Sequence, residues 1–175
     1  ATKAFENYDH TRALETAETF FWTFTDDYLE LVKERAYASG DQSPQAIGSA
    51  VIALRRALAI LVRPFAPFIP FAAEEVWSWW QEGSVHLAPW PKTSEIEFTD
   101  AQLMKVASDV LVMVRKTKSD AKVSMKAEIE SMVLAGPAAI ASFADDLRAV
   151  GKIQRLELIV ANELVISEFK FAPAE

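Results

Sequence analysis

Three prolines at intervals of three residues constrain the fold of this chain more than any other feature of its sequence. They are Pro64, Pro67 and Pro70, and each is followed by a phenylalanine, at positions 65, 68 and 71. Proline lacks a backbone N–H donor and fixes φ, so a regular α-helix cannot continue through all three. A period of three is typical of polyproline II or a 3₁₀ turn, with prolines on one side and rings on the other. We therefore predict a rigid elbow that directs three aromatic rings into a core.

Helices are predicted on both sides of this elbow. The preceding helix is expected to end near Arg63, because proline disfavours helical geometry in the residue before it. The following helix is expected to begin at Pro70, since proline suits the first helical position, and to end at Gly83. A further long helix is predicted over residues 11–37, where apolar residues recur at steps of three and four.

The C-terminal part of the sequence has a different periodicity, and a loop rich in Pro, Gly, Ser and Thr at residues 83–99 separates it from the rest. Beyond the loop the pattern predicts a long helix, a strand at EIESMVLA, a helix over residues 138–150, and a hairpin of two strands joined at Asn162-Glu163. The predicted fold class is therefore mainly α. A helical bundle at residues 1–95 is followed by a small α+β appendage at residues 100–175.

Composition narrows the classes of function. The 175 residues include no cysteine and two histidines far apart in sequence, which excludes disulfides and thiolate metal sites and argues against a zinc centre. No apolar run reaches the length needed to span a bilayer, and no signal-peptide pattern opens the chain. We therefore expect a cytoplasmic location, with neither a membrane nor a metal as a partner.

The distribution of charge permits binding of nucleic acid at one basic segment, whereas the net charge opposes non-specific binding over the whole surface. The formal net charge is −7, which opposes general attraction to phosphates. One segment at residues 115–126 nevertheless carries five basic side chains and a single acidic one, and phosphate contacts act over short distances at cellular salt. Those basic residues are Arg115, Lys116, Lys118, Lys122 and Lys126. The alternative is an ordinary solvated surface.

Catalytic patterns are missing from the sequence. It contains no serine or cysteine paired with a base, no metal-ligand spacing and no glycine-rich phosphate loop. We therefore assign no catalytic residue and no cofactor to this chain.

Three segments resemble the anticodon-binding helical domain of valyl-tRNA synthetase, in the class I aminoacyl-tRNA synthetase family. They are FFWTFTDDYLELVKERAY at 20–37, FAPFIPFAAEEVWSWW at 65–80 and SVHLAPWP at 84–91. The resemblance is strong over about residues 1–95 and weaker over 100–170. It implies the tRNA-binding, anticodon-recognising part of a valine–tRNA ligase, with the anticodon loop of a valine tRNA as partner. The parent enzyme would use ATP with magnesium, but its catalytic motifs and editing domain are absent from this sequence.

The same resemblance implies which residues contact tRNA. Anticodon reading needs planar groups to stack on unpaired bases, polar groups for base edges and basic groups for phosphates. In the family the helix at 20–37 lines the anticodon site, and it supplies these types here as Trp22, Asp26, Tyr28, Lys33 and Arg35. Trp22 and Lys33 are eleven residues apart, which places them on one face of a regular helix. The alternative is that Trp22 and Tyr28 belong to the core and the charges are only solvated.

Other expected tRNA contacts lie beside the elbow and in the basic segment. Arg63 would bind the tRNA backbone, or else pair with Glu74 or Glu75. The basic segment would contribute phosphate contacts through Arg115, Lys116, Lys118 and Lys122. His86, in a loop near several tryptophans, is expected to be packed and hydrogen-bonded rather than bound to RNA.

Two other functions fit the same residues. The anticodon-binding domain of isoleucyl-tRNA synthetase shares the elbow, although it more often continues into a zinc-binding tail that needs cysteines. A stand-alone helical protein-interaction module with an exposed aromatic groove is the alternative from a different class. In the family a further helix normally precedes the one with Trp22, so we also expect an exposed apolar strip on the first two long helices.

Overall fold

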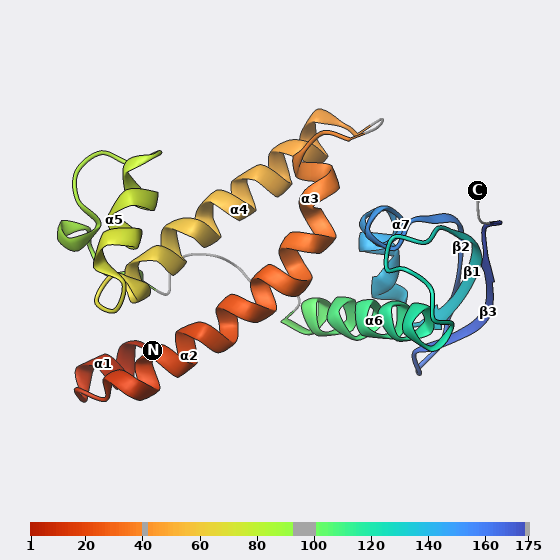
Figure 1. The fold of residues 1–175 in the computed structure, drawn as a ribbon, viewed down its shortest axis with the longest axis horizontal. Coiled ribbons are helices and arrows are strands. Elements are labelled where there is room, and N and C mark those ends of the chain that lie inside the picture. Colours follow the sequence, from red (N-terminus) through yellow and green to blue (C-terminus); the bar gives the residue numbers. More distant parts are fainter. Residues whose placement is uncertain (40–41, 93–100, 174–175) are drawn as a thin grey trace. The chain divides into compact units, whose positions relative to one another are not determined.

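The computed structural model describes residues 1–39, 42–92 and 101–173 (Figure 1). It is mainly helical and has one three-stranded sheet near its C-terminus, which confirms the predicted fold class. The chain divides into two compact units, unit 1 (Ala1–Asp26 and Gln42–Glu97) and unit 2 (Asp27–Asp41 and Phe98–Glu175). The sequence analysis placed one boundary, at residues 95–100. The structure adds a division inside the first long helix, because residues after Asp26 pack with the C-terminal helices.

Unit 1 is built from helices joined by short turns. They are α1 (Thr2–Glu6), α2 (His10–Thr23), α4 (Pro44–Phe65), α5 (Pro70–Ser78) and the 3₁₀ helix η2 (Val85–Leu87). Side-chain caps explain two of the starts. The Asp9 carboxylate accepts a hydrogen bond from the Arg12 amide at 3.0 Å, and the Ser43 hydroxyl accepts one from the Ala46 amide at 3.2 Å.

The elbow is a helix end followed by a tight turn, not a polyproline segment. Helix α4 continues through Pro64 and ends at Phe65, so the prediction of an end near Arg63 is wrong by two residues. Pro64 supplies no amide to the Ile60 carbonyl, so one backbone bond of the last turn is lost, and the helix ends at the next residue. The amides of Phe68 and Ile69 both donate to the Phe65 carbonyl at 2.9 Å, which closes the turn.

Only two of the three elbow rings are directed inward. Phe65 contacts Phe21 with ring centroids 5.5 Å apart, and Phe68 contacts Phe5 at 5.9 Å. Phe71 is 90% exposed, so its predicted core position is wrong. The cause is the helix start at Pro70, which was predicted correctly and leaves the next side chain on an outer face of the first turn.

The C-terminal end of α5 also differs from the prediction. The helix ends at Ser78, five residues before Gly83, which adopts φ of +74° in the following turn. The core beside this helix is a compact cluster around one tryptophan. It consists of Val62, Ala66, Ala73, Trp77 and Val85, with Val76, Trp80 and Ala88 packed against it.

Helix α4 leaves much of its apolar surface exposed. Large exposed apolar side chains on α2 and α4 are Phe20, Trp22, Ile52, Leu58 and Ile60, as expected for the first two long helices.

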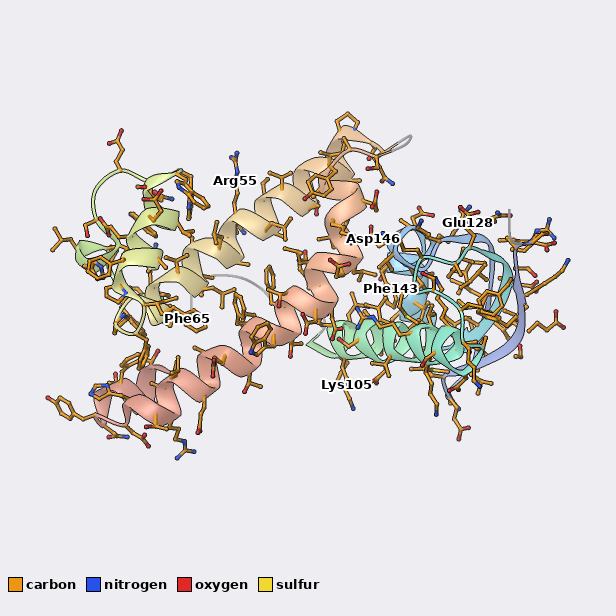
Figure 2. The ribbon with its side chains drawn as sticks, in the orientation of Figure 1. Arg55, Phe65, Lys105, Glu128, Phe143 and Asp146 are labelled. Carbon is orange, nitrogen blue, oxygen red and sulfur yellow. The ribbon has the colours of Figure 1, made fainter. Side chains whose placement is uncertain are left out.

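By length and hydropathy alone α4 is able to span a bilayer, which corrects the sequence-based expectation about apolar runs. Arg55 and Arg56 interrupt it near its middle, where charge opposes a membrane position, and Arg55 extends away from the helix (Figure 2).

The predicted helix at 11–37 is interrupted by a π-helical segment, η1 (Phe24–Leu29). Threonine chemistry accounts for the change locally. The Thr25 hydroxyl donates to the Phe21 carbonyl at 3.0 Å, which is the acceptor that the Thr25 amide would use in an α-helix. Because a π-helix has i→i+5 bonds, the regular spacing that placed Trp22 and Lys33 on one face does not hold through this segment.

Unit 2 combines helices with a mixed sheet. Its elements are α3 (Glu30–Ala36), α6 (Ala101–Asp120), β1 (Ile129–Gly136), the 3₁₀ helix η3 (Ala138–Phe143), α7 (Ala144–Gly151), β2 (Ile153–Val160) and β3 (Val165–Phe171). The strand order is β2-β1-β3, with β2 parallel and β3 antiparallel to β1. The predicted hairpin of β2 and β3 is therefore wrong. Strand β1, the most buried of the three, lies between them, and the crossover through η3 and α7 makes β2 parallel to it.

The core of unit 2 contains the largest fully buried side chains of the described chain. Strand β1 supplies three of them and the surrounding helices supply the others. They are Ile129, Met132, Leu134, Leu147, Val32 and Val110. Segments distant in sequence thus share one apolar core.

Candidate RNA-binding surface

Trp22 lies on the surface of unit 1. Its side chain is 56% exposed, and its ring contacts the edge of Phe21 with centroids 5.2 Å apart. Phe21 is held in turn by Phe65. The alternative that Trp22 belongs to the core does not hold, and an exposed ring supported from one side is suited to stacking on a base. Asp26 is also exposed, with the Thr25 hydroxyl 3.4 Å from its carboxylate.

Tyr28 and Arg35 belong to the packing of unit 2. An ion pair joins Arg35 Nη2 to Asp146 Oδ2 at 2.9 Å, with side chains 24% and 11% exposed. Burial raises the pKa of Tyr28, and the neighbouring Arg35 partly opposes this. Burial likewise raises the pKa of Asp146 despite Arg35, because loss of hydration outweighs the attraction of the guanidinium. Asp146 from α7 and Phe143 from η3, both labelled in Figure 2, line the same pocket as Tyr28 and Arg35.

Arg63 has a partner that neither sequence alternative included. Its guanidinium carbon lies 5.2 Å from the ring centroid of Trp77, a cation–π contact. Glu74, one of the expected partners, instead accepts hydrogen bonds from the Ser84 hydroxyl at 2.9 Å and the Val85 amide at 3.0 Å. The geometry favours a structural role for Arg63.

His86 is more exposed than predicted. Its imidazole Nε2 lies 4.0 Å from Glu74 Oε2, and its side chain is 43% exposed. The expectation of a packed histidine is therefore wrong, and the Glu74 carboxylate accepts its hydrogen bonds from Ser84 and Val85 instead.

Members of the basic segment have three different environments. Arg115 pairs with Asp27 through Nη1 and Oδ1 at 3.2 Å, whereas Lys116 and Lys122 are exposed. Lys118 is only 2% exposed. Its ammonium donates to three backbone carbonyls, those of Met125 at 3.0 Å, Ala127 at 2.9 Å and Gly151 at 2.9 Å. The expectation that Lys118 contacts tRNA is therefore corrected, because all three of its donors are used within the fold.

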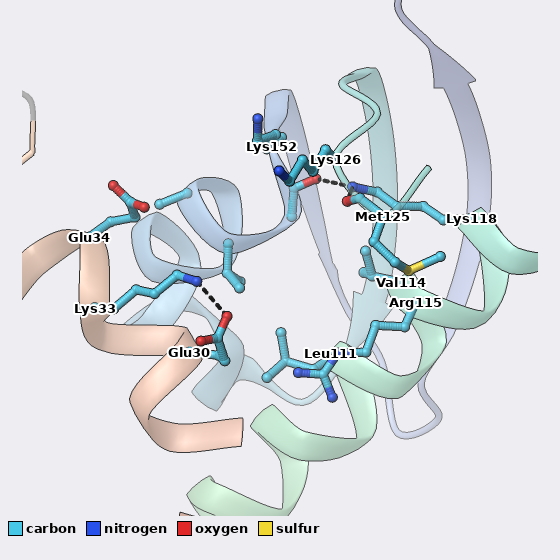
Figure 3. A pocket seen from close by; sticks show the side chains of 13 residues that line it. Glu30, Lys33, Glu34, Leu111, Val114, Arg115, Lys118, Met125, Lys126 and Lys152 are labelled. Atoms are coloured by element: carbon cyan, nitrogen blue, oxygen red, sulfur yellow. Dashed lines mark hydrogen bonds and ion pairs between the residues drawn. The ribbon is translucent and has the colours of Figure 1, made fainter. Parts of the chain in front are cut away.

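A cleft of about 500 Å³ lies within unit 2 between α3, α6, the turn before β1 and the end of α7 (Figure 3). We call it the basic cleft. Its charged lining residues are Lys33, Arg115, Lys118, Lys126 and Lys152, with Glu30 and Glu34. The structure thus brings together three residues of the predicted site, Lys33 from α3 with Arg115 and Lys118 from α6. Lys33 forms an ion pair with Glu30.

Lys152 is a lining residue that the sequence analysis missed. It stands alone between Gly151 and an apolar strand, and no local pattern distinguishes it from an ordinary surface lysine. Lys126 belonged to the recognised basic segment but was not selected. Only the folding of α7 against α6 brings Lys152 to the cleft.

No group of three or more His, Cys, Asp or Glu side chains is placed to hold a metal ion among the residues that the structure describes.

The chain is similar in sequence to known tRNA ligases. The sequence model of a family described as the anticodon-binding domain of tRNA ligase matches residues 1–133. A valine–tRNA ligase of Leifsonia xyli subsp. xyli is 50% identical over 99% of this chain, and one of Thermobifida fusca is 48% identical over 100% of it. A third, of Cutibacterium acnes, is 44% identical over 96% of the chain. The chain spans only about one fifth of the length of these relatives, 21%, 20% and 20% respectively. On this evidence of shared sequence and helical architecture, the chain belongs to the family of anticodon-binding domains of tRNA ligases.

Proposed function

We propose that this chain is the tRNA-binding, anticodon-recognising part of a valine–tRNA ligase. The observation that carries the proposal is the family match over residues 1–133, together with 50% identity to a valine–tRNA ligase over nearly the whole chain. The intact enzyme would join valine to its tRNA in the cytoplasm at the expense of ATP, with magnesium. This chain would supply recognition of the tRNA and no catalytic group or cofactor.

The proposed partner is the anticodon loop of a valine tRNA. Trp22 is suited to stack on an unpaired base, and the nearby Asp26 to accept a hydrogen bond from a base edge. Basic side chains that reach the surface would contact phosphates, and these are Lys33, Arg115, Lys116 and Lys122. Arg35 is retained as a supporting residue, because its ion pair with Asp146 anchors α3, the helix that carries Lys33. Tyr28 and Arg63 are partly buried within the fold and are assigned no direct contact with the tRNA.

Trp22→Ala tests the stacking role. Loss of a stacking ring is expected to cost about 1–3 kcal/mol of binding free energy, with little change in salt dependence. Binding of an anticodon stem-loop would be titrated at three salt concentrations. Phe20→Ala is the matched control, because Phe20 is on the same helix and is also 56% exposed.

Two results would contradict the proposal. One is equal binding of the valine stem-loop and of stem-loops with unrelated anticodons. The other is valine-dependent ATP–pyrophosphate exchange by the pure chain, which would mean that it carries catalytic chemistry.

A further inference from the structure

The wall of the basic cleft contains a buried positive charge without an acidic partner. Lys118 is satisfied by three neutral carbonyls, and no carboxylate pairs with it in the part of the chain that the structure describes. Carbonyl groups solvate an ammonium but do not cancel its charge. The positive potential of Lys118 therefore extends into the cleft beside it.

Lys152 adds a second positive charge from an unfavourable backbone conformation. It caps α7 with φ of 53°, in the left-handed region that usually holds glycine. Glycine occupies the preceding position, 151, because a Cβ there would come within 2.8 Å of the Ile153 side chain. Burial is the larger of two causes that lower the pKa of Lys118. The second cause is repulsion between its ammonium and that of Lys152.

The remaining charges leave the cleft positive. Lys126 and Lys152 are exposed at its rim, and Arg115 approaches from α6 (Figure 3). Two carboxylates line the cleft against five cations. Two of these cations are paired, Lys33 with Glu30 and Arg115 with Asp27, so the excess positive charge comes from Lys118, Lys126 and Lys152. This concentration of positive charge contrasts with a net charge of −7 for the whole chain. An anion in the cleft would relieve the repulsion between the lysines.

The lining favours a phosphate group over a base or a nucleotide. None of the 13 lining residues is aromatic, so the cleft offers no plane for stacking. Its donors are ammonium and guanidinium groups from separate segments, which bind phosphate oxygens without reading sequence.

We propose that the basic cleft binds a backbone phosphodiester of the tRNA, with Lys126 and Lys152 as its principal contacts. The cleft would fix the position of the RNA on unit 2, while base recognition remains with the surface around Trp22. The proposal rests on the proposed function, because it takes tRNA as the source of the phosphate.

Lys152→Gly gives the sharpest test, since it separates binding from folding. Glycine removes the charge and also suits the left-handed conformation, so the urea midpoint is expected to rise. Affinity for a full-length valine tRNA transcript is expected to fall about 5- to 10-fold near 0.1 M salt, and the slope of log K against log[salt] to decrease by about one. A purely structural role for Lys152 predicts the rise in stability with unchanged RNA binding.

Lys126→Ala is the second variant, and Lys105→Ala is the control. Lys105 is exposed on α6 but does not line the cleft (Figure 2). Lys126→Ala is expected to weaken binding of all tRNAs by the same factor as Lys152→Gly, and Lys105→Ala to leave it unchanged. Equal affinity and equal salt slope for all three variants and the parent would overturn the proposal.

Two further measurements separate the possible causes of failure. If Trp22→Ala weakens tRNA binding while the cleft variants do not, the cleft proposal is wrong and the proposed function stands. If the parent binds no tRNA, both fail together. Inorganic phosphate at constant ionic strength is expected to displace tRNA only at millimolar concentrations, and a tight site for free phosphate would assign the cleft to a soluble anion instead.

Discussion

The two units bury their apolar residues in opposite ways. All six of the largest fully buried side chains lie in unit 2, where three of them come from strand β1. In unit 1 alanine is the commonest buried residue, and many large side chains remain on the surface although Leu61 and Trp77 are buried. Those exposed ones include Phe20, Trp22, Ile52, Phe71, Trp79 and Leu87.

This difference indicates which unit supports itself and which is specialised for contact. Burial of large side chains supplies most of the stability of a small domain, so unit 2 is expected to be the more stable. Unit 1 keeps several aromatic side chains, including Trp22, Phe71 and Trp79, exposed and available for a ligand or a partner. All five tryptophans belong to unit 1, so their fluorescence reports that unit alone, while amide exchange on β1 reports unit 2.

The largest expected effect separates the two units directly. Leu147 is fully buried, and Leu147→Ala is expected to lower the free energy of unfolding of unit 2 by about 2–5 kcal/mol. Phe71→Ala, at a position 90% exposed, is expected to change the stability of unit 1 by less than about 0.5 kcal/mol. Urea unfolding would be followed by β1 amide exchange and by tryptophan emission. A large decrease in the stability of unit 1 for Phe71→Ala would contradict the difference between the two units, because unit 1 would then also depend on that ring.

A smaller loss is expected from the polar part of the unit 2 core. Lys118→Met leaves three carbonyls without their donor, and each unsatisfied carbonyl is expected to destabilise the fold by about 1–3 kcal/mol. The substitution also removes the cost of burying a charge, which offsets part of this loss. We therefore expect a net loss of about 2 kcal/mol in urea unfolding of unit 2. Lys116→Met, on the exposed side of the same helix, should change stability by less than about 0.5 kcal/mol. Unchanged or increased stability of Lys118→Met would show that the ammonium is dispensable.

The smallest effect concerns pH. The pKa of Asp146 is raised above its ordinary value of 3.8, chiefly by burial, so the folded state binds this proton more tightly than the unfolded state. Its contribution to stability is therefore present below pH 3.8 and is lost as pH rises through the higher pKa of the folded state. Relative to Asp146→Asn, the parent should gain stability in unit 2 as pH falls through this window. The tryptophan signal of unit 1 should show no difference between the two proteins, and the opposite trend in unit 2 would mean that pairing with Arg35 outweighs burial.

Features set by local chemistry could be read from the sequence. Helix α5 begins at Pro70 as predicted, because proline at the first helical position needs no partner from elsewhere in the chain. All three strands were found from alternating apolar residues, and the family was indicated by the segments around Trp22 and the elbow. Each of these signals lies within a few consecutive residues.

Other features depended on which distant segments meet. The alternating pattern of a strand does not indicate which strand it pairs with, so the sequence did not predict that β1 lies between β2 and β3. Lys118 and Lys122 belong to the same basic segment of the sequence. Lys118 is nevertheless buried and donates to three carbonyls, whereas Lys122 is exposed. Lys152 enters the basic cleft only because α7 packs beside α6. Periodicity determined the elements, and the resemblance of three segments indicated the family. The environment of each charge was decided by tertiary packing, because burial and hydrogen-bond partners come from residues far away in the chain.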